Sequence, residues 1–278
     1  MSSTINVGGR LIDLSVPRIM GVLNITPDSF YAGSRLENET EILRRASEML
    51  KSGADILDIG GYSSRPGADD ITEEEELERV TGALRNLRRE FPSAILSLDT
   101  FRSSIADICI SEYGVDIIND ISGGSLDSAM FGTIAKHNVP YIIMHMKGNP
   151  QNMQKNPFYE DIMTEIIRWF SEKKRELVLK GVKDIIIDPG FGFGKTIEHN
   201  FIMLNNLERF SILDLPVLAG LSRKSMIWKI LGIGPEESLN GTTVLNTIAL
   251  MKGISILRVH DVAEAVEAVR LVSRLQGS

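Results

Sequence analysis

The chain has 278 residues, of which 43% are hydrophobic and 24% are charged, and its formal net charge is −7 at neutral pH. This composition is that of an ordinary globular protein, and the length suits two average domains or one barrel-sized domain. A net negative charge without a run of five basic residues excludes the long basic face that nucleic-acid binding needs, although a locally positive site could still bind a small anion.

The cysteine content and the hydropathy pattern indicate the compartment in which the protein is expected. Cys109 is the only cysteine, so no internal disulfide can form, and its apolar surroundings predict a packed core thiol. The start of the chain does not pair a basic region with an apolar run, and no segment approaches 18 uncharged apolar residues. We therefore expect a cytoplasmic protein with no membrane partner.

Short apolar runs alternate with longer amphipathic segments along the chain. Two short β patterns around Gly8 and Gly9 predict a hairpin within residues 1–16. The predicted strands that follow are 18–24, 54–60, 94–100, 115–121, 140–146, 183–189, 215–221 and 254–260. The predicted helical segments are 39–52, 72–90, 102–112, 126–138, 158–180, 197–209, 223–231 with 236–252, and 261–275. Thr72, followed by an acidic turn, is typical of a helix start.

The strand pattern predicts the fold class. The strands are continuous apolar runs, which favours a parallel sheet covered on both faces. Eight strand–helix units in roughly 250 residues match a (β/α)8 TIM barrel. We expect one domain over residues 1–278, with the hairpin (1–16) plugging the bottom of a barrel (17–278). The alternative is a doubly wound open sheet, which would use only two or three strand ends at one crevice, whereas a barrel would use nearly all of them.

Polar residues recur where each predicted strand ends. They are Asn24, Asp58, Asp99, Asn119, His145, Asp188, Lys224, Arg258 and His260. Burying unpaired charges is costly, and the C-terminal strand ends of a barrel meet at the mouth where such enzymes react. Structural interpretations remain open for some of them. Asp58 could mainly hold loops, an acid after a strand is often a helix cap, and His145 is more often a core histidine.

The segment VKDIIIDPGFGFGKT (182–196) resembles a phosphate-binding loop at first sight. The G-x-x-x-x-G-K-[ST] pattern requires glycine where Pro189 stands, and the glycine spacing does not fit G-x-G-x-x-G either. What remains is a loop that presents Phe191 and Phe193 beside Asp188. Aromatic faces next to a carboxylate suit a flat, nitrogen-rich ring.

Three further segments could contact a ligand. GLSRKSMIWKI places Ser222, Arg223 and Lys224 at a helix start, which favours anions, although a solvated basic turn is the alternative. The loops NITPDSFYAGSR and GYSSRPGADD follow the first two strands and could be mobile lids or ordinary loops.

Together, seven motifs in order resemble the dihydropteroate synthase family. They are MGVLNITPDSF, DIGGYSSRPGA, SLDTFR, INDISGG, DPGFGFGKT, GLSRKSMI and RVHDVAEAV, and they cover about residues 18–270. The resemblance implies a (β/α)8 barrel that forms a homodimer and is a target of sulfonamides. It implies a transferase of folate biosynthesis that condenses 6-hydroxymethyl-7,8-dihydropterin diphosphate with 4-aminobenzoate, with Mg²⁺ as cofactor, giving dihydropteroate and diphosphate.

The resemblance also implies roles for individual residues. The pterin site would comprise Asp99, Asn119, Ile121, Met144, Asp188, Phe193, Gly220 and Lys224. The diphosphate site would comprise Asn24, Arg258 and His260, with Asn24 also the metal ligand; the aminobenzoate site would comprise Ser64, Arg65, Pro66, Phe193 and Ser222. Asp99, Lys224, Arg258 and His260 would be the catalytic set, with Lys224 hydrogen-bonding the pterin rather than forming a Schiff base. The family usually has threonine where Ser64 stands, so the hydroxyl is kept and a methyl is lost.

Three other functions are compatible with parts of the pattern. A pterin-dependent methyltransferase would share the barrel but would not need the SSRPG loop or the Arg258–His260 pair. A non-catalytic pterin-binding paralogue would have lost residues such as Asn24 and Arg65, which are present here. A Schiff-base aldolase barrel would rest on Lys224 alone.

Overall fold

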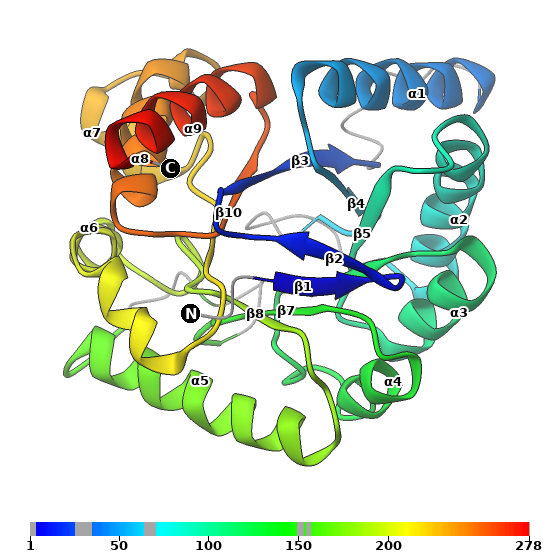
Figure 1. Ribbon diagram of the computed structural model, residues 1–278, viewed down its shortest axis with the longest axis horizontal. Helices are drawn as coiled ribbons and strands as arrows, with labels where there is room; N and C mark the ends of the chain where they lie inside the picture. The colour runs from blue at the N-terminus through cyan, green and yellow to red at the C-terminus, as the bar shows by residue number, and fades with distance from the viewer. Residues whose placement is uncertain (1–3, 26–34, 64–70, 149–152, 154–156, 278) are drawn as a thin grey trace.

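The computed structural model describes residues 4–25, 35–63, 71–148, 153 and 157–277. Its main feature is a ring of eight parallel strands surrounded by helices (Figure 1). The strands are β3 (Arg18–Asn24), β4 (Ile56–Gly60), β5 (Ile95–Asp99), β6 (Ile117–Asp120), β7 (Tyr141–Met144), β8 (Ile185–Asp188), β9 (Leu218–Ala219) and β10 (Ile256–Val259). Each lies within a segment that the sequence predicted as a strand.

The strand order identifies the ring as a barrel. Hydrogen-bonded neighbours follow the order β8-β7-β6-β5-β4-β3-β10-β9. A parallel bridge between Ile187 and Val217 joins the two ends of this order, and the Ile187 amide donates to the carbonyl of Pro216 over 3.0 Å. The predicted (β/α)8 barrel is therefore confirmed, and the open doubly wound sheet is wrong.

Helices cover the outer face of the barrel (Figure 1). They are α1 (Arg35–Ser52), α2 (Glu73–Glu90), α3 (Ser103–Tyr113), α4 (Met130–His137), α5 (Ile162–Leu179), α6 (Ile197–Asn205), α7 (Ser225–Leu231), α8 (Leu239–Met251) and α9 (Val262–Gln276), with 3-10 turns η2 (Leu207–Leu213) and η3 (Pro235–Glu237). The predicted start at Thr72 is confirmed, because its hydroxyl accepts from the Glu75 amide and the Glu75 carboxylate accepts from the Thr72 amide. The predicted helix 197–209 is shorter than expected, since its last part belongs to η2.

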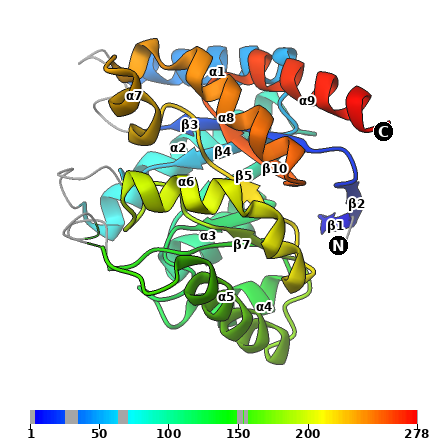
Figure 2. The same cartoon turned by 90° about the vertical axis from the view of Figure 1, so that its left-hand side faces the viewer.

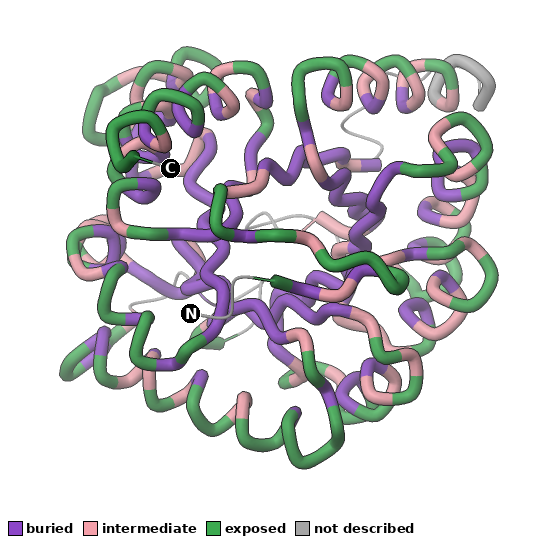
Figure 3. The backbone as a smooth tube through the Cα atoms, in the orientation of Figure 1, coloured by how far each residue is buried: buried purple, intermediate pink, exposed green. Residues whose placement is uncertain are grey.

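Alternate residues along each strand enter two different apolar cores. One residue from each strand forms a layer inside the barrel: Met20, Ile56, Ile95, Ile117, Ile142, Ile186, Leu218 and Ile256. Intervening residues such as Leu57, Leu96 and Ile143 face outward and pack under the helices. Because both strand faces are buried (Figure 3), the strands read as continuous apolar runs in the sequence. Cys109 belongs to the outer core and is fully buried, as predicted.

The N-terminal hairpin closes one end of the barrel (Figures 1 and 2). Strands β1 (Thr4–Val7) and β2 (Arg10–Asp13) pair antiparallel. Ile5, Val7 and Leu14 join the apolar layer inside the barrel, and the Asn6 amide donates to Asp184 Oδ1 over 3.1 Å. The hairpin was predicted from the sequence and is confirmed. Its position leaves the opposite end of the barrel, where the strands finish, as the place for a site.

None of the helices in the described part of the chain combines the length and the hydropathy needed to cross a bilayer.

Candidate active site

The barrel interior changes from apolar to polar two residues beyond the apolar layer. On five strands, an apolar side chain is followed at the next inward position by a polar one: Asp58 after Ile56, Ser97 after Ile95, Asn119 after Ile117, Asp188 after Ile186 and Arg258 after Ile256. The two-residue period of a strand places both members of each pair on the same face. The polar members lie nearer the C-terminal strand ends, so they converge at the barrel mouth.

Arg258 and Asp58 form the centre of a buried polar network. Asp58 is fully buried and accepts three hydrogen bonds: from Ser97 Oγ over 2.6 Å, from Asn119 Nδ2 over 3.1 Å and from Arg258 Nε over 2.7 Å. Arg258 Nη2 donates to Asp99 Oδ2 over 2.7 Å. Charge-assisted bonds of this kind are stronger than neutral ones. The network therefore fixes the orientation of Asp99 and Asn119, two of the predicted pterin residues.

Burial dominates the electrostatics of this network. Desolvation raises the pKa of Asp99 to about 7, with Arg258 opposing the rise and Asp58 adding to it. The two carboxylates raise the pKa of Arg258 above its ordinary value in spite of its burial, so the guanidinium stays charged. The mouth thus holds a permanent cation beside a carboxylate that titrates near neutrality. Ionisable groups with perturbed pKa values that gather at one place are typical of active sites.

Lys224 and Asp188 form a second charged group across the mouth. Lys224 immediately precedes α7, donates to the carbonyl of Phe191, and lies 4.8 Å from the ring centre of Phe193. Burial lowers the pKa of Lys224 to about 8, against the pull of Asp188. Asp188 accepts from the Gly190 amide over 2.7 Å, and burial raises its pKa although Lys224 opposes the rise. This pair can present one acceptor and one donor to a bound heterocycle.

The glycines after β8 allow the loop to approach the end of β7 closely. Gly190 and Gly194 have φ values of 72° and 62°, which L side chains rarely adopt. A Cβ on Gly190 would lie 2.1 Å from the His145 carbonyl oxygen, and one on Gly194 would lie 2.6 Å from that of Lys147. The loop therefore requires glycine for its conformation and packing, which explains the repeated glycines without invoking a phosphate cradle.

The two phenylalanines of this loop differ in position. Phe193 is half-buried and lies against Lys224, as a ligand-stacking residue would. Phe191 is fully buried in the core between strands and helices, so the expectation that both rings face a ligand is wrong for Phe191. Gly192, between the two rings, has a φ value of 82°, so the backbone turns there and the two rings do not share one face.

Asn24, Ser222 and His260 complete the described mouth. A Cβ built on Gly60 would lie 3.6 Å from Asn24 Oδ1 and 3.5 Å from Asp99 Cβ, so a glycine there leaves room for both polar side chains. The buried Ser222 hydroxyl accepts from the His260 amide over 3.2 Å and lies 3.0 Å from its Nδ1. His260 itself is exposed to solvent.

The remaining predicted site residues fall into two groups. Ile121 and Met144 are buried beside the polar network at the ends of β6 and β7, and Gly220 follows β9 with Lys224 Nζ 3.8 Å from its Cβ position. The predicted aminobenzoate residues Ser64, Arg65 and Pro66 lie outside the described residues.

Arg223 does not form a solvated basic turn, because its guanidinium makes a bidentate pair with Asp261 at 3.0 and 2.6 Å.

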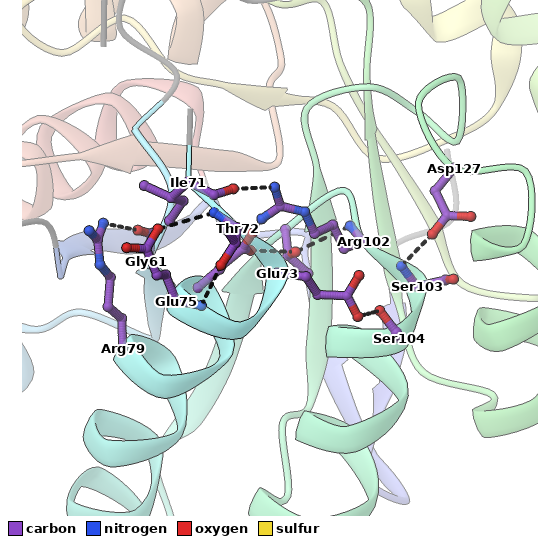
Figure 4. Close-up of polar contacts among 12 residues, drawn as sticks. Gly61, Ile71, Thr72, Glu73, Glu75, Arg79, Arg102, Ser103, Ser104 and Asp127 are labelled. Atoms are coloured by element: carbon purple, nitrogen blue, oxygen red, sulfur yellow. Dashed lines mark hydrogen bonds and ion pairs between the residues drawn. The ribbon is translucent and has the colours of Figure 1, made fainter. Parts of the chain in front are cut away.

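The described ends of the loop after β4 are held by two arginines (Figure 4). Arg79 Nη1 donates to the Gly61 carbonyl over 3.2 Å, and Arg102 Nη2 donates to the Ile71 carbonyl over 2.7 Å. Arg102 in turn pairs with Glu76, a fully buried carboxylate on α2 that also accepts from Thr100 Oγ1 over 2.7 Å. The entry and exit of this loop are thereby fixed to α2 and to the start of α3.

Sequence reasoning missed Ser97 and the buried Lys195 in this region. It named Asp58 as a polar strand-end residue but did not assign it to the site, yet Asp58 accepts from three mouth residues. The parity of the strands could have found Asp58 and Ser97, because both occupy inward positions two residues after an apolar layer residue. His145 is a buried histidine 5.2 Å from the Trp169 ring, which confirms its interpretation as a core residue.

Asn24, the predicted metal ligand, places one oxygen donor at the mouth. No cluster of three or more histidine, cysteine or acidic side chains able to hold a metal occurs among the described residues. Mg²⁺ commonly takes one or two protein oxygens together with waters and substrate phosphates. Asn24, whose Oδ1 lies at the end of β3 close to Asp99, is a donor of that kind.

Comparisons with known proteins agree with this geometry. The model of the pterin binding enzyme family matches residues 20–260, which is most of the chain. Dihydropteroate synthase from Escherichia coli strain K12 is 41% identical over 266 residues, covering 95% of this chain and 93% of that protein.

Solved structures give the same result. The Yersinia pestis dihydropteroate synthase in complex with a sulfonamide drug superposes with a TM-score of 0.92 at 39% identity, covering 99% of this chain and 100% of the other. The Xanthomonas albilineans enzyme in complex with 7,8-dihydropteroate superposes with a TM-score of 0.88 at 33% identity, covering 99% of each chain.

Proposed function

The chain belongs to the dihydropteroate synthase family of pterin-binding transferases, and from this premise we propose how its barrel mouth performs the reaction. The proposed reaction joins 6-hydroxymethyl-7,8-dihydropterin diphosphate to 4-aminobenzoate and releases diphosphate and 7,8-dihydropteroate. The observation that carries the proposal is the convergence of Asp99, Asn119, Asp188, Lys224 and Arg258 at one end of the barrel. These groups supply acceptors for ring N–H groups and cations for a leaving anion.

The pterin ring binds among the residues at the ends of β5, β6 and β8. Asp188 and Asp99 accept hydrogen bonds from ring N–H groups, while Asn119 and Lys224 provide donors. Ile121, Met144 and Gly220 form the apolar and small-residue walls, and Phe193 closes the mouth. The polar network supports this assignment, because Asp58 holds Asn119 by a 3.1 Å bond and Arg258 holds Asp99 by a 2.7 Å bond.

The diphosphate binds beside Arg258, His260 and Asn24. The guanidinium stays charged beside Asp58 and Asp99, and the exposed His260 can reach a solvent-facing phosphate. Asn24 would hold the magnesium ion together with substrate oxygens, and the ion would neutralise diphosphate charge when bound. These residues stabilise the charge that develops as the bond between the exocyclic carbon and diphosphate oxygen breaks.

The amine needs orientation more than activation. The reduced pterin donates electrons toward its exocyclic carbon as diphosphate leaves, and the aminobenzoate nitrogen then forms the new C–N bond and loses a proton. Phe193 and Ser222 border the described part of the aminobenzoate site, and Ser64, Arg65 and Pro66 would complete it. Positioning two reactants in this way supplies a large part of a rate enhancement.

A homodimer is supported by an exposed apolar face on neighbouring helices. Val244, Ile248 and Met251 recur at helical spacing on α8 and are each more than a third exposed. Ile230 on α7 and Leu271 on α9 are also exposed. Apolar side chains gathered on one face typically mark a protein interface. We propose that a second copy of the chain covers this face, and Ile248→Glu should convert a dimer into a monomer in sedimentation velocity.

Two further assignments accompany this proposal. The chain forms one domain (residues 1–278), because the hairpin (1–16) shares an apolar cluster with strands of the barrel (17–278). A cytoplasmic location is supported by the single, fully buried thiol of Cys109, which suits a reducing compartment.

The test is a reaction with purified protein, dihydropterin diphosphate, 4-aminobenzoate and Mg²⁺. We expect diphosphate release that requires aminobenzoate and matches dihydropteroate formation one to one. Pterin binding without product would instead identify a non-catalytic binding protein. Borohydride should trap no substrate adduct on Lys224, and a trapped adduct would contradict its assignment as a hydrogen-bond donor.

A further inference from the structure

Lys195 is a buried lysine at the end of the loop that follows β8. Its ammonium lies 2.9 Å from the Phe193 carbonyl oxygen, 3.1 Å from the His145 carbonyl oxygen and 3.1 Å from His145 Nδ1. A lysine ammonium has three N–H donors, so three acceptors satisfy it completely. Only 3% of the residue is exposed. Burial lowers the pKa of the Lys195 ammonium well below its usual range, against the pull of Asp188, and a buried charge is costly unless it is paired or hydrogen-bonded.

The acceptor role of His145 fits its surroundings. The ring is buried among Tyr159, Trp169 and Phe170. Burial, followed by the charges of Lys195 and Lys147, lowers its pKa well below the usual range. A neutral imidazole can accept at Nδ1 from the Lys195 ammonium, an arrangement that requires the tautomer with its proton on Nε2.

The loop is held from both sides by lysines. Lys195 binds the carbonyl of Phe193, and Lys224 binds the carbonyl of Phe191. The amide of Gly192, between them, donates to Asn200 Oδ1 over 2.7 Å. Backbone groups of three successive loop residues are thus hydrogen-bonded to side chains. These bonds hold the conformation of a segment that has no regular secondary structure.

We propose that Lys195 is a positioning residue for the pterin pocket, an inference that rests on the proposed function. By joining the end of β7 to the Phe193 carbonyl, it fixes the loop that begins at Asp188 and carries the Phe193 ring to the mouth. The lysine of the GKT motif therefore binds the loop backbone from the side of β7 and does not bind a phosphate. Without it, Phe193 and the loop after Asp188 lose their fixed place before the pterin arrives.

The experiment compares Lys195→Met, which keeps the length of the side chain and removes its donors, with the unchanged protein. We expect the KM for dihydropterin diphosphate to rise at least tenfold, while kcat stays within threefold, because binding must first order the loop. A purely structural role gives the opposite pattern, since a smaller folded fraction lowers the apparent kcat and leaves KM unchanged. Lys195→Gln, which retains a donor amide, should recover part of the affinity.

Lys174→Met is the matched control. Lys174 Nζ also donates to a backbone carbonyl, that of Leu213 over 2.6 Å, but on the N-terminal side of β9 and away from the mouth. Its KM should equal that of the unchanged protein. An unaltered KM in Lys195→Met, or failure of both Lys195 variants to fold, would overturn the proposal. Absence of activity in the unchanged protein would instead contradict the proposed function.

Discussion

At the end closed by the hairpin, the strands point isoleucine, leucine and methionine side chains into the barrel, whereas two residues further along several of them point Asp58, Ser97 and Arg258 into the same interior. The side chains of the lower layer pack against one another as one apolar cluster. The upper network is held by charge-assisted hydrogen bonds between strands distant in the sequence. One end of the barrel therefore contributes mainly to stability. The other end contains buried charges, whose desolvation lowers stability, and these charges serve ligand binding.

The largest expected effect comes from removing the centre of the upper network. Asp58→Asn replaces the carboxylate that accepts from Ser97, Asn119 and Arg258 with a neutral amide. Arg258 is then left in an ion pair with Asp99 alone. Breaking a buried ion pair costs about 3–5 kcal/mol, so the free energy of unfolding should fall by about that amount. Urea denaturation measures it, and the pterin KM should rise as well, because asparagine keeps only one oxygen for three donors and the bond that orients Asn119 is weakened. An unchanged pterin KM in this variant would show that the network does not contribute to pterin binding.

The matched change in the lower layer is Ile56→Ala, two residues before Asp58 on β4. Removing this buried side chain should cost about 3 kcal/mol of stability because a cavity is left inside the barrel. The kcat and KM of the folded enzyme should not change. Loss of activity in fully folded Ile56→Ala protein would mean that the two layers do not have separate functions.

A smaller effect concerns the pH dependence of the mouth. Burial lowers the pKa of Lys224 to about 8, so its positive charge is lost as the pH rises through that value. We expect kcat/KM for the pterin substrate to fall above pH 8, by about tenfold one unit higher. Lys224→Arg keeps the charge at all these pH values, because guanidinium does not titrate there. The alkaline limb should therefore disappear from the profile of this variant, and its persistence would assign the limb to another group.

The sequence was sufficient to predict the barrel and most of the mouth for physical reasons that the structure makes clear. Continuous apolar strands indicated burial on both faces, and polar residues such as Asp188 and Arg258 stood near the strand ends, where Asp188 is followed by Pro189 and Gly190 and so caps no helix. These features are local in the sequence. Similarity to known motifs added the individual roles, which remain proposals for this chain.

The sequence could not predict features that depend on which residues meet across the barrel. Asp58 is bonded to Arg258, 200 positions away, and nothing near either residue indicates the other. Phe191 and Phe193 look equivalent in GFGFG, but the positive φ value of Gly192 turns the backbone between them, and Phe191 enters the core. Lys195 received no role from the sequence, because its acceptors on Phe193 and His145 are brought to it only by the fold.

The most direct test of the polar mouth compares two buried aspartates on strands that lie close in the barrel. Asp188 faces the interior, whereas Asp120, at the end of β6, accepts from the Tyr141 hydroxyl over 2.6 Å and from the amides of Ser122 and Gly124. Pterin affinity is measured by calorimetric titration of folded Asp188→Asn and Asp120→Asn proteins. We predict a loss of about 100-fold for Asp188→Asn, corresponding to two charged hydrogen bonds, and no loss for Asp120→Asn. Equal affinities in both variants would contradict the placement of the pterin pocket inside the barrel mouth.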